Sequence, residues 1–121
     1  MRGIRGAITV EHNEKEEIWQ AAQKLLTELL KKNEIATTDI AACIFSVTKD
    51  LDAGFPARGA RGIAGFERVP LMDVQQMDVA GALPHCIRVL LLVNTDKMQQ
   101  EVQPVYLGEA VKLRRDLTQT K

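Results

Sequence analysis

Hydrophobic positions along this chain change their spacing from segment to segment, and the spacing predicts strands that alternate with helices. Residues 2–11 (RGIRGAITVE) place their large apolar side chains at even positions, which is typical of a β-strand. Between residues 18 and 30 apolar side chains return every three or four positions, which predicts a long amphipathic helix. Asn13 stands where it can cap the start of this helix, and the polar residues 31–33 mark its end.

The elements that follow this helix are predicted to be shorter. Residues 41–48 (AACIFSVT) form an apolar run of strand length, and a loop leads from there to Pro56, which suits the first turn of a helix that runs to Ala64. Beyond it we expect extended pieces over residues 66–74, a turn over 81–84, a strand over 86–93, a short polar helix over 96–101 and a last apolar segment over 104–113.

This order of elements predicts a single α/β (α+β) domain over residues 1–121, with one mixed sheet and helices mostly on one face. A chain of 121 residues and 13.5 kDa can bury a modest core. One long helix covers only part of such a sheet. We therefore expect the chain to associate with copies of itself around a shared interior lined by strands.

One charged residue interrupts the most hydrophobic strand. In CIRVLLLV, residues 86–93, Arg88 stands among branched apolar residues that do not alternate with polar ones, as in a strand covered on both faces. An unpaired cation in such a strand costs several kcal/mol. Three partners are compatible with the sequence: a carboxylate of the same chain, solvent at the open end of the strand, or an anionic ligand.

Composition argues against several classes of partner. The 16 basic and 16 acidic residues give a formal net charge of zero, so no overall positive field attracts nucleic acid or anionic lipid. No unbroken apolar run approaches the roughly 20 residues of a membrane span, and residues 1–11 lack the apolar region of a signal peptide. Cys43 and Cys86 lie in apolar runs and are predicted to be reduced. We expect a cytoplasmic protein that binds neither nucleic acid nor membrane.

The basic residues are divided by type along the chain. Between residues 6 and 57 every cation is a lysine, whereas the arginines stand outside this interval, at positions 2, 5, 58, 61, 68, 88, 114 and 115. Arginine is preferred over lysine where a protein recognises carboxylates or phosphates with paired hydrogen bonds. The arginines are therefore expected to converge on an anion.

Familiar catalytic motifs are absent from the sequence. No serine or cysteine has a catalytic partner at a recognisable spacing, no His/Cys/Asp group suits a metal, and RGIRGA and RGARGIAG match neither phosphate-loop pattern. His12 and His85 are interpreted as surface or turn residues. The arginines, the single tyrosine Tyr106 and the polar segment MDVQQMD remain. These groups could bind a small dianion without metal or cofactor, in an enzyme or equally in a binding protein.

Several segments resemble one known family. The segments RGIRGAITVE, FPARGARGIAGFERVPL, QMDV, CIRV and VYLGEAVKLR, in this order across almost the whole chain, resemble the small monofunctional bacterial chorismate mutases, which form trimeric pseudo α/β-barrels. The resemblance implies a homotrimer that rearranges chorismate to prephenate, on the route to phenylalanine and tyrosine, without metal or cofactor. This pericyclic reaction needs no external acid, base or nucleophile, which agrees with the empty motif search.

The resemblance also implies roles for individual residues. Arg88 matches the position that donates to the ether oxygen and to a substrate carboxylate, and Arg5 and Tyr106 match positions that hold the enolpyruvyl carboxylate. A further group matches a segment that closes the pocket of a neighbouring subunit: Phe55, Ala57, Arg58 and Arg61. Other pocket positions are matched by Leu71, Met72, Leu113 and Arg114, the last at the pocket mouth. As structural alternatives, Phe55 could belong to the core, and Arg61 and Arg114 to the solvated surface.

Two residues depart from the family pattern. Gln76 stands where the family usually has a glutamate that approaches the substrate, and Asp73 stands where a small uncharged residue is usual. One hypothesis is that the carboxylate has moved to Asp73, which faces the positive ring side of the transition state, while Gln76 keeps a hydrogen-bonding role. The alternative is that Asp73 is a surface residue or the internal partner of Arg88, and that the site has lost its anion.

Two other functions stay open at this level. A trimer with little or no activity could bind a small carboxylate as a regulatory module, which the missing glutamate makes less remote. The imine-deaminating proteins form a similar trimeric barrel and also use a buried arginine for a carboxylate. Against this last reading, RGIRGA and VYLxxAVxLR match the mutases.

Overall fold

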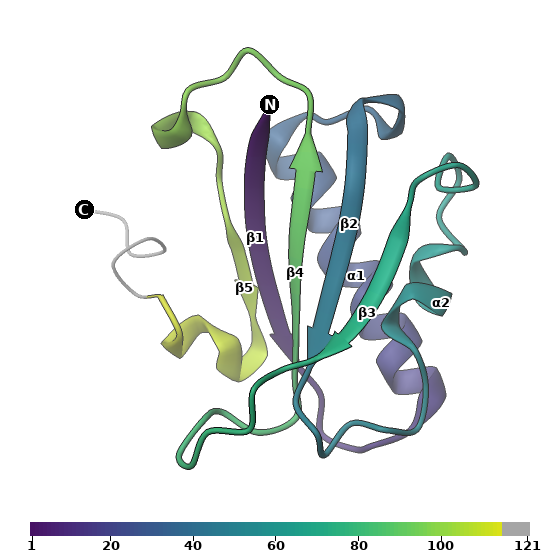
Figure 1. The fold of residues 1–121 in the computed structure, drawn as a ribbon, viewed down its shortest axis with the longest axis vertical. Helices are drawn as coiled ribbons and strands as arrows, with labels where there is room; N and C mark the ends of the chain where they lie inside the picture. The colour runs from purple at the N-terminus through teal and green to yellow at the C-terminus, as the bar shows by residue number, and fades with distance from the viewer. Residues whose placement is uncertain (115–121) are drawn as a thin grey trace.

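The computed structural model describes residues 1–114 of the chain (Figure 1). Its strands are β1 (Arg2–Thr9), β2 (Ile40–Val47), β3 (Leu71–Gln75), β4 (Cys86–Val93) and β5 (Val105–Leu107). The α-helices are α1 (Lys15–Asn33) and α2 (Pro56–Ala60), and the short 3₁₀ helices are η1 (Thr37–Asp39), η2 (Gln99–Glu101) and η3 (Gly108–Lys112). No described helix has the length and apolar character that crossing a membrane requires.

The strands form one mixed sheet in the order β3-β2-β4-β1-β5. The central strand β4 pairs antiparallel with β1 and with β2, whereas the edge strands β5 and β3 run parallel to β1 and β2. In this register Arg88 lies between Ala7 on β1 and Ser46 on β2. The predicted α+β domain with a mixed sheet is confirmed.

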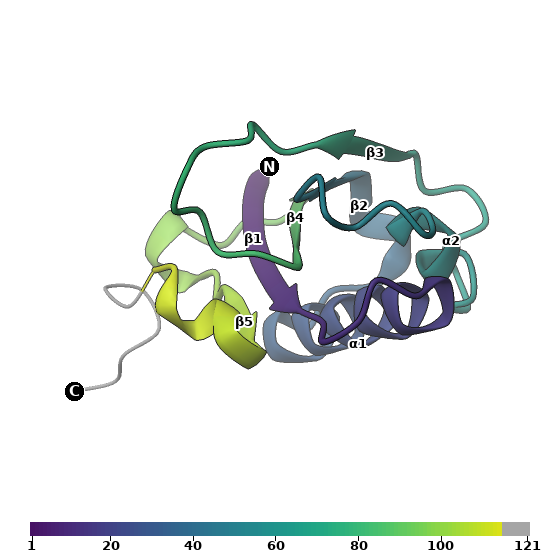
Figure 2. The same ribbon diagram turned by 90° about the horizontal axis from the view of Figure 1, so that it is seen from below.

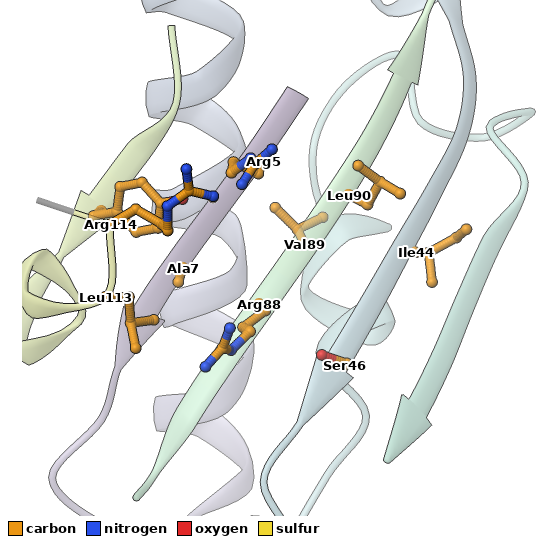
Figure 3. Close-up of a pocket in the computed structure, with 11 residues that line it drawn as sticks. Arg5, Ala7, Ile44, Ser46, Arg88, Val89, Leu90, Leu113 and Arg114 are labelled. Atoms are coloured by element: carbon orange, nitrogen blue, oxygen red, sulfur yellow. The ribbon is translucent and has the colours of Figure 1, made fainter. Parts of the chain in front are cut away.

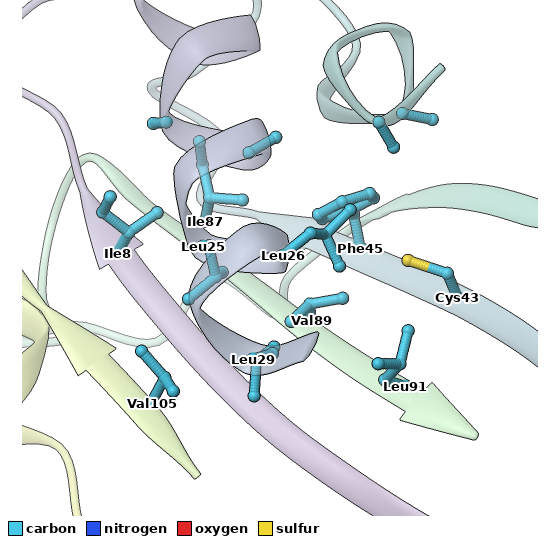
Figure 4. Packing of buried hydrophobic residues seen from close by; sticks show 14 of the residues in the cluster. Ile8, Leu25, Leu26, Leu29, Cys43, Phe45, Ile87, Val89, Leu91 and Val105 are labelled. Carbon is cyan, nitrogen blue, oxygen red and sulfur yellow. The ribbon is translucent and has the colours of Figure 1, made fainter. Parts of the chain in front are cut away.

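Both α-helices lie on the same side of the sheet (Figures 1 and 2). The apolar stripe of α1, predicted from its spacing, packs against side chains that point from the strands to this side (Figure 4). Each fully buried leucine contributes roughly 1.5–3 kcal/mol relative to an exposed one. The centre of this core consists of Ile8, Leu25, Leu26, Leu29, Phe45, Ile87, Val89 and Leu91.

The other face of the sheet carries no α-helix in the described part of the chain. Along β4 the burial therefore alternates: Ile87, Val89 and Leu91 are buried, whereas Arg88 is half-buried and Leu90 is 43% exposed. Of the described residues, only η3 and its neighbours cover one corner of this open face. The prediction that residues 86–93 are covered on both faces is thus wrong for a single chain, because its one long helix lies on the opposite side.

The start of α1 also differs from the prediction. The helix begins after Glu14, and no side chain caps its first turn. Asn13 instead accepts the backbone N–H groups of Asp52 and Ala53 at 3.1 and 3.0 Å, and donates to the Asp52 carboxylate at 2.7 Å. The side chain predicted as a helix cap therefore ties the beginning of α1 to the loop that leads to Phe55.

Most of the later elements are shorter than predicted. Helix α2 ends at Ala60 instead of Ala64, in a stretch where recurring glycines disfavour a continued helix. Of residues 66–74, only those from Leu71 onward pair as a strand, and Phe66 is buried in the core between turns. The polar segment 96–101 forms only η2, and the last apolar segment is divided between β5 and η3.

Helix α2 packs directly on α1 at Gly59. A Cβ atom on Gly59 would lie 2.3 Å from the backbone oxygen of Trp19 and 2.8 Å from its Cα. Next to this contact the guanidinium carbon of Arg58 lies 5.2 Å from the centre of the Trp19 ring, a distance that suits a cation–π interaction. Because Gly59 has no side chain, residues 55–61 can pack close against α1.

Gly59→Ala is expected to lower the free energy of unfolding by about 1–3 kcal/mol, because the added methyl group forces α2 away from α1. Urea unfolding of the variant measures this loss. Gly3→Ala is the control, because a Cβ there would meet only the ends of the Leu90 and Leu92 side chains, at 3.3 and 3.6 Å. Equal stabilities of the two variants would contradict the close helix contact.

Candidate active site

The open face of the sheet holds a hollow of about 500 Å³ with Arg88 in its floor (Figure 3). Because side chains alternate along a strand, Arg88 points away from α1, together with its neighbours Ala7 and Ser46. The hollow is lined by Arg5, Gly6, Ala7, Ile44, Ser46, Arg88, Val89, Leu90, Tyr106, Leu113 and Arg114. The structure thus brings together five of the predicted site residues: Arg5, Arg88, Tyr106, Leu113 and Arg114.

Three guanidinium groups surround the phenol of Tyr106. The parallel pairing of β5 with β1 sets Tyr106 beside Ala7, where the tyrosine is 9% exposed. Burial raises the pKa of Tyr106, and the positive charges of Arg5, Arg114 and Arg88 partly oppose this rise. Tyr106 therefore remains a neutral hydrogen-bond donor at physiological pH, in a strongly positive environment.

No carboxylate within residues 1–114 forms an ion pair with Arg88 or with Arg5. The Nε atom of Arg88 is buried and has no hydrogen-bond partner in this part of the chain. A buried donor without a partner costs free energy, so native structures rarely keep one. Of the three partners compatible with the sequence, the described residues exclude an internal carboxylate and leave two, solvent or an anionic ligand at this open face.

A second hollow, of about 840 Å³, lies beside α2 and the edge strand β3. It contains the other group of predicted residues, namely Phe55, Ala57, Arg58, Arg61 and Asp73. Phe55 is 72% exposed, so the alternative that it belongs to the core is wrong. No residue of the described range 1–114 lines both hollows.

Asp73 lies on the side of the sheet that faces the helices. It is paired in register with the buried Phe45, and its carboxylate accepts the N–H of Ala57 at 3.0 Å. Burial raises the pKa of Asp73, against the effects of the Ala57 N–H and of the Arg61 charge. The alternative that Asp73 is the internal partner of Arg88 is therefore wrong, because the two side chains point to opposite faces.

Three predicted residues lie outside both hollows. Gln76 follows β3, and its N–H donates to the Val47 carbonyl oxygen at 2.8 Å while its side-chain oxygen is buried without a partner among the described residues. Leu71 packs against the core, and Met72 is 57% exposed on the open side of the same strand. Within one chain none of these three lies beside the arginines of the open face.

The chain matches the family model described as chorismate mutase type I over residues 1–117. The chain belongs to the type I chorismate mutase family. It is 52% identical over 118 residues to the chorismate mutase AroH of Thermus thermophilus, with 97% of this chain and 96% of that protein covered. The AroH of Bacillus subtilis is 44% identical over 121 residues, with 100% and 95% covered. A solved chorismate mutase from Clostridium thermocellum matches with a TM-score of 0.90 and 47% identity, covering 93% of this chain and 100% of that one.

Membership in the chorismate mutase family confirms the resemblance drawn from the sequence and the predicted class of enzyme, an isomerase. In this chorismate mutase the open-face hollow is also lined by three residues that were not predicted from the sequence: Ile44, Ser46 and Leu90. The sequence contains one indication of them, because side chains two positions apart on a strand point to the same face. Ile44 and Ser46 are two apart on β2, and Arg88 and Leu90 are two apart on β4. Using this indication required the strand register, which the sequence does not contain.

One group of possible metal ligands occurs in the described part of this chorismate mutase, at the start of α1. Ligand atoms of His12, Glu14 and Glu17 lie within 4.8 Å of one another. Sequence spacing did not indicate this group, because the bend before the helix brings the residues together. The Glu17 carboxylate also accepts the N–H of Glu11 at 2.7 Å, and its hydrogen bond with the ring raises the pKa of His12. The group lines neither hollow.

Proposed function

We propose that this chain rearranges chorismate to prephenate at a site centred on Arg88. The observation that carries the proposal is Arg88 itself, which lines the open-face hollow while its buried Nε has no hydrogen-bond partner and no described carboxylate pairs with it in residues 1–114. Arg5 lines the same hollow, and no described carboxylate neutralises it. A dianionic substrate supplies the negative charge that these guanidinium groups lack.

The reaction is intramolecular, so the protein exchanges no atoms with the substrate. A carbon–oxygen ether bond of chorismate breaks while a carbon–carbon bond forms, and the ether oxygen becomes partly negative in the transition state. Arg88 donates to this oxygen from a fixed place in the floor of the hollow. Because β4 and its neighbours already hold the side chain, little reorganisation is needed as the charge develops.

Arg5, Tyr106 and Arg114 bind the carboxylates of the substrate. Guanidinium groups suit this task because they present paired donors in a fixed plane, and the neutral Tyr106 hydroxyl adds one more. Holding both carboxylates selects the compact, chair-like conformer in which the reacting carbon atoms approach each other. This restraint lowers the entropic part of the barrier.

The second hollow completes the site of another subunit. Phe55, Arg58 and Arg61 line a hollow that shares no residue with the one around Arg88, so in one chain both groups do not enclose the same ligand. The open face also exposes apolar side chains, among them Met72 and Leu90, which suits an interface between copies of the chain. A homotrimer with three sites between subunits accounts for both features.

Two alternative functions use the same arginines. A carboxylate-binding regulatory trimer would hold a dianion without converting it, and an imine-deaminase-like trimer would act on a different substrate. The named chorismate mutases among the relatives favour the mutase. Loss of chorismate absorbance when purified protein is added separates the three functions, because neither alternative forms prephenate.

Arg88→Lys is expected to lower kcat by on the order of a hundredfold or more, because a single ammonium group does not reproduce contacts to both the ether oxygen and a carboxylate. KM should change less than kcat, since the positive charge is kept. Steady-state kinetics from chorismate absorbance provide both values. Near-normal turnover would show that Arg88 has only a structural role.

Mixing two inactive variants is expected to restore activity if the sites are shared. When Arg88→Ala and Arg61→Ala chains are unfolded, mixed in equal amounts and refolded, about one quarter of the sites combine two intact halves in a randomly assembled ring. Arg88→Ala mixed with Arg5→Ala is the control, because both variants damage the same half and no site is intact. No recovery from the Arg88→Ala and Arg61→Ala mixture, or an active monomer in sedimentation equilibrium, would rule out the shared site.

Asp73→Asn is expected to lower turnover if Asp73 supplies the anion that Gln76 lacks, because the ring fragment becomes partly positive as the ether bond breaks. Adding Gln76→Glu to that variant should recover part of the loss. Gln76→Glu alone should help little, because two nearby carboxylates repel each other and one tends to take up a proton.

Turnover of the wild type, both single variants and the double variant forms a thermodynamic cycle in which we expect strong non-additivity. Since Asp73 and Gln76 do not share a hollow in one chain, this coupling would arise at a subunit interface. Additive effects, or an Asp73→Asn enzyme as fast as the wild type, would mean that the enzyme works through its arginines alone.

A further inference from the structure

The end of the sheet that carries Arg88 contains a small polar network, in which Thr48 and Cys86 are buried and Asp50 and His85 are partly exposed. There β1 and β2 end and β4 begins (Figure 1). Thr48, directly after β2, is buried, and its hydroxyl donates to Asp50 while accepting the N–H of Cys86 at 3.1 Å. The backbone of Thr48 also donates to the Cys86 carbonyl oxygen at 3.1 Å. Two of these three hydrogen bonds hold Cys86, the first residue of β4, and the third orients the Thr48 hydroxyl toward Asp50.

The residue before β4 is held in an unfavourable backbone conformation. His85 has a φ of 51°, in the left-handed region that residues with a side chain rarely adopt. Both carboxylate oxygens of Asp50 accept the N–H of His85, at 3.1 and 3.2 Å. The carbonyl oxygen of His85 accepts the N–H of Val10 at 3.0 Å. Asp50 and Val10, the residue after β1, therefore hold the chain in the bend from which β4 starts.

This network continues to Arg88 through Cys86. Cys86 and Arg88 are two residues apart on β4, so their side chains lie on the same open face. The Cys86 thiol is fully buried, and the Arg88 guanidinium lies close enough to oppose the rise that burial causes in the pKa of this thiol. Cys86 therefore lies next to Arg88 on this face of β4, and Thr48 fixes where Cys86 lies.

We infer that Thr48 and Asp50 are positioning residues for Arg88: they fix the start of β4 and, through Cys86, the place of the guanidinium. The inference rests on the proposed role of Arg88 in the reaction. Neither residue lines the hollow around Arg88, so neither contacts the substrate there. An error of about 1 Å in the place of a reacting group can cost on the order of a hundredfold in rate.

Thr48→Val tests the inference, since it keeps the shape of the side chain but removes the hydroxyl. We expect kcat to fall by about tenfold to a hundredfold with KM changed by less than about threefold, because the misplaced donor serves the transition state more than binding. Thr48→Ser keeps the hydroxyl and should hold kcat within about threefold of the wild type. Asp50→Asn keeps one acceptor oxygen and should also lower kcat, with KM changed by less than about threefold. This variant provides the test if Thr48→Val does not fold.

Thr95→Val is the matched control. Its hydroxyl accepts the N–H of Lys97 at 3.2 Å, just beyond the other end of β4, and removing it should leave kcat unchanged. The inference is overturned if Thr48→Val lowers stability in urea but keeps the kcat of the wild type. It is also overturned if Thr48→Ser is as slow as Thr48→Val, because the hydroxyl is then not the relevant group.

A double variant separates this inference from the proposed function. In the Arg88→Lys background, Thr48→Val should lower kcat by less than about twofold, because no guanidinium is left to position. If Arg88→Lys alone turns over like the wild type, the proposed function fails. If Arg88→Lys is slow but Thr48→Val is not, only the positioning role is wrong.

Discussion

A sheet with both helices on one face is the constraint on which the rest of this structure depends. Helix α1 packs on the apolar side of β1, β2 and β4, and within residues 1–114 nothing of comparable size covers the other side (Figure 2). This arrangement gives Arg88 a place that is neither core nor bulk solvent. Its neighbours in the sheet fix the side chain, while its charge avoids the full desolvation cost of a buried ion. The same open face exposes apolar groups that favour assembly, and assembly would then remove water from around the cation.

The sequence was sufficient for the elements whose pattern is long and regular. Helix α1 follows from its spacing and strand β4 from its continuous apolar run, and the mixed sheet follows from the order of the elements. Predictions were wrong where a distant partner competes with a local rule. Asn13 has the right type and position to cap α1, but its side-chain oxygen accepts the backbone N–H groups of Asp52 and Ala53 instead. Strand β4 lacks alternation in its sequence because its open face is also apolar, and this pattern does not reveal whether the cover comes from the same chain.

The candidate site shows the same division between what residue types reveal and what only the fold reveals. The unusual Arg88 and the clustering of arginines pointed to an anion without any structure. The parallel pairing of β5 with β1, which sets Tyr106 beside Arg5, is invisible in the sequence, since nothing local specifies which edge β5 joins. Asp73 shows how sensitive such reasoning is to parity. One step along β3 separates the side of the sheet that faces α2 from the open side, which carries Arg5 and Arg88 on other strands.

The position of Trp19 has a consequence for how this protein can be observed. It is the only tryptophan of the chain, and its ring lies near two cations, Lys15 at 5.8 Å and Arg58 at 5.2 Å. Indole emission depends on nearby charge and on exposure to water. The intrinsic fluorescence of the protein therefore reports on the hollow that holds Phe55 and Arg61, without a label. A subunit or ligand that enters this hollow changes the signal at its source, so assembly and binding can be followed in the unmodified chain.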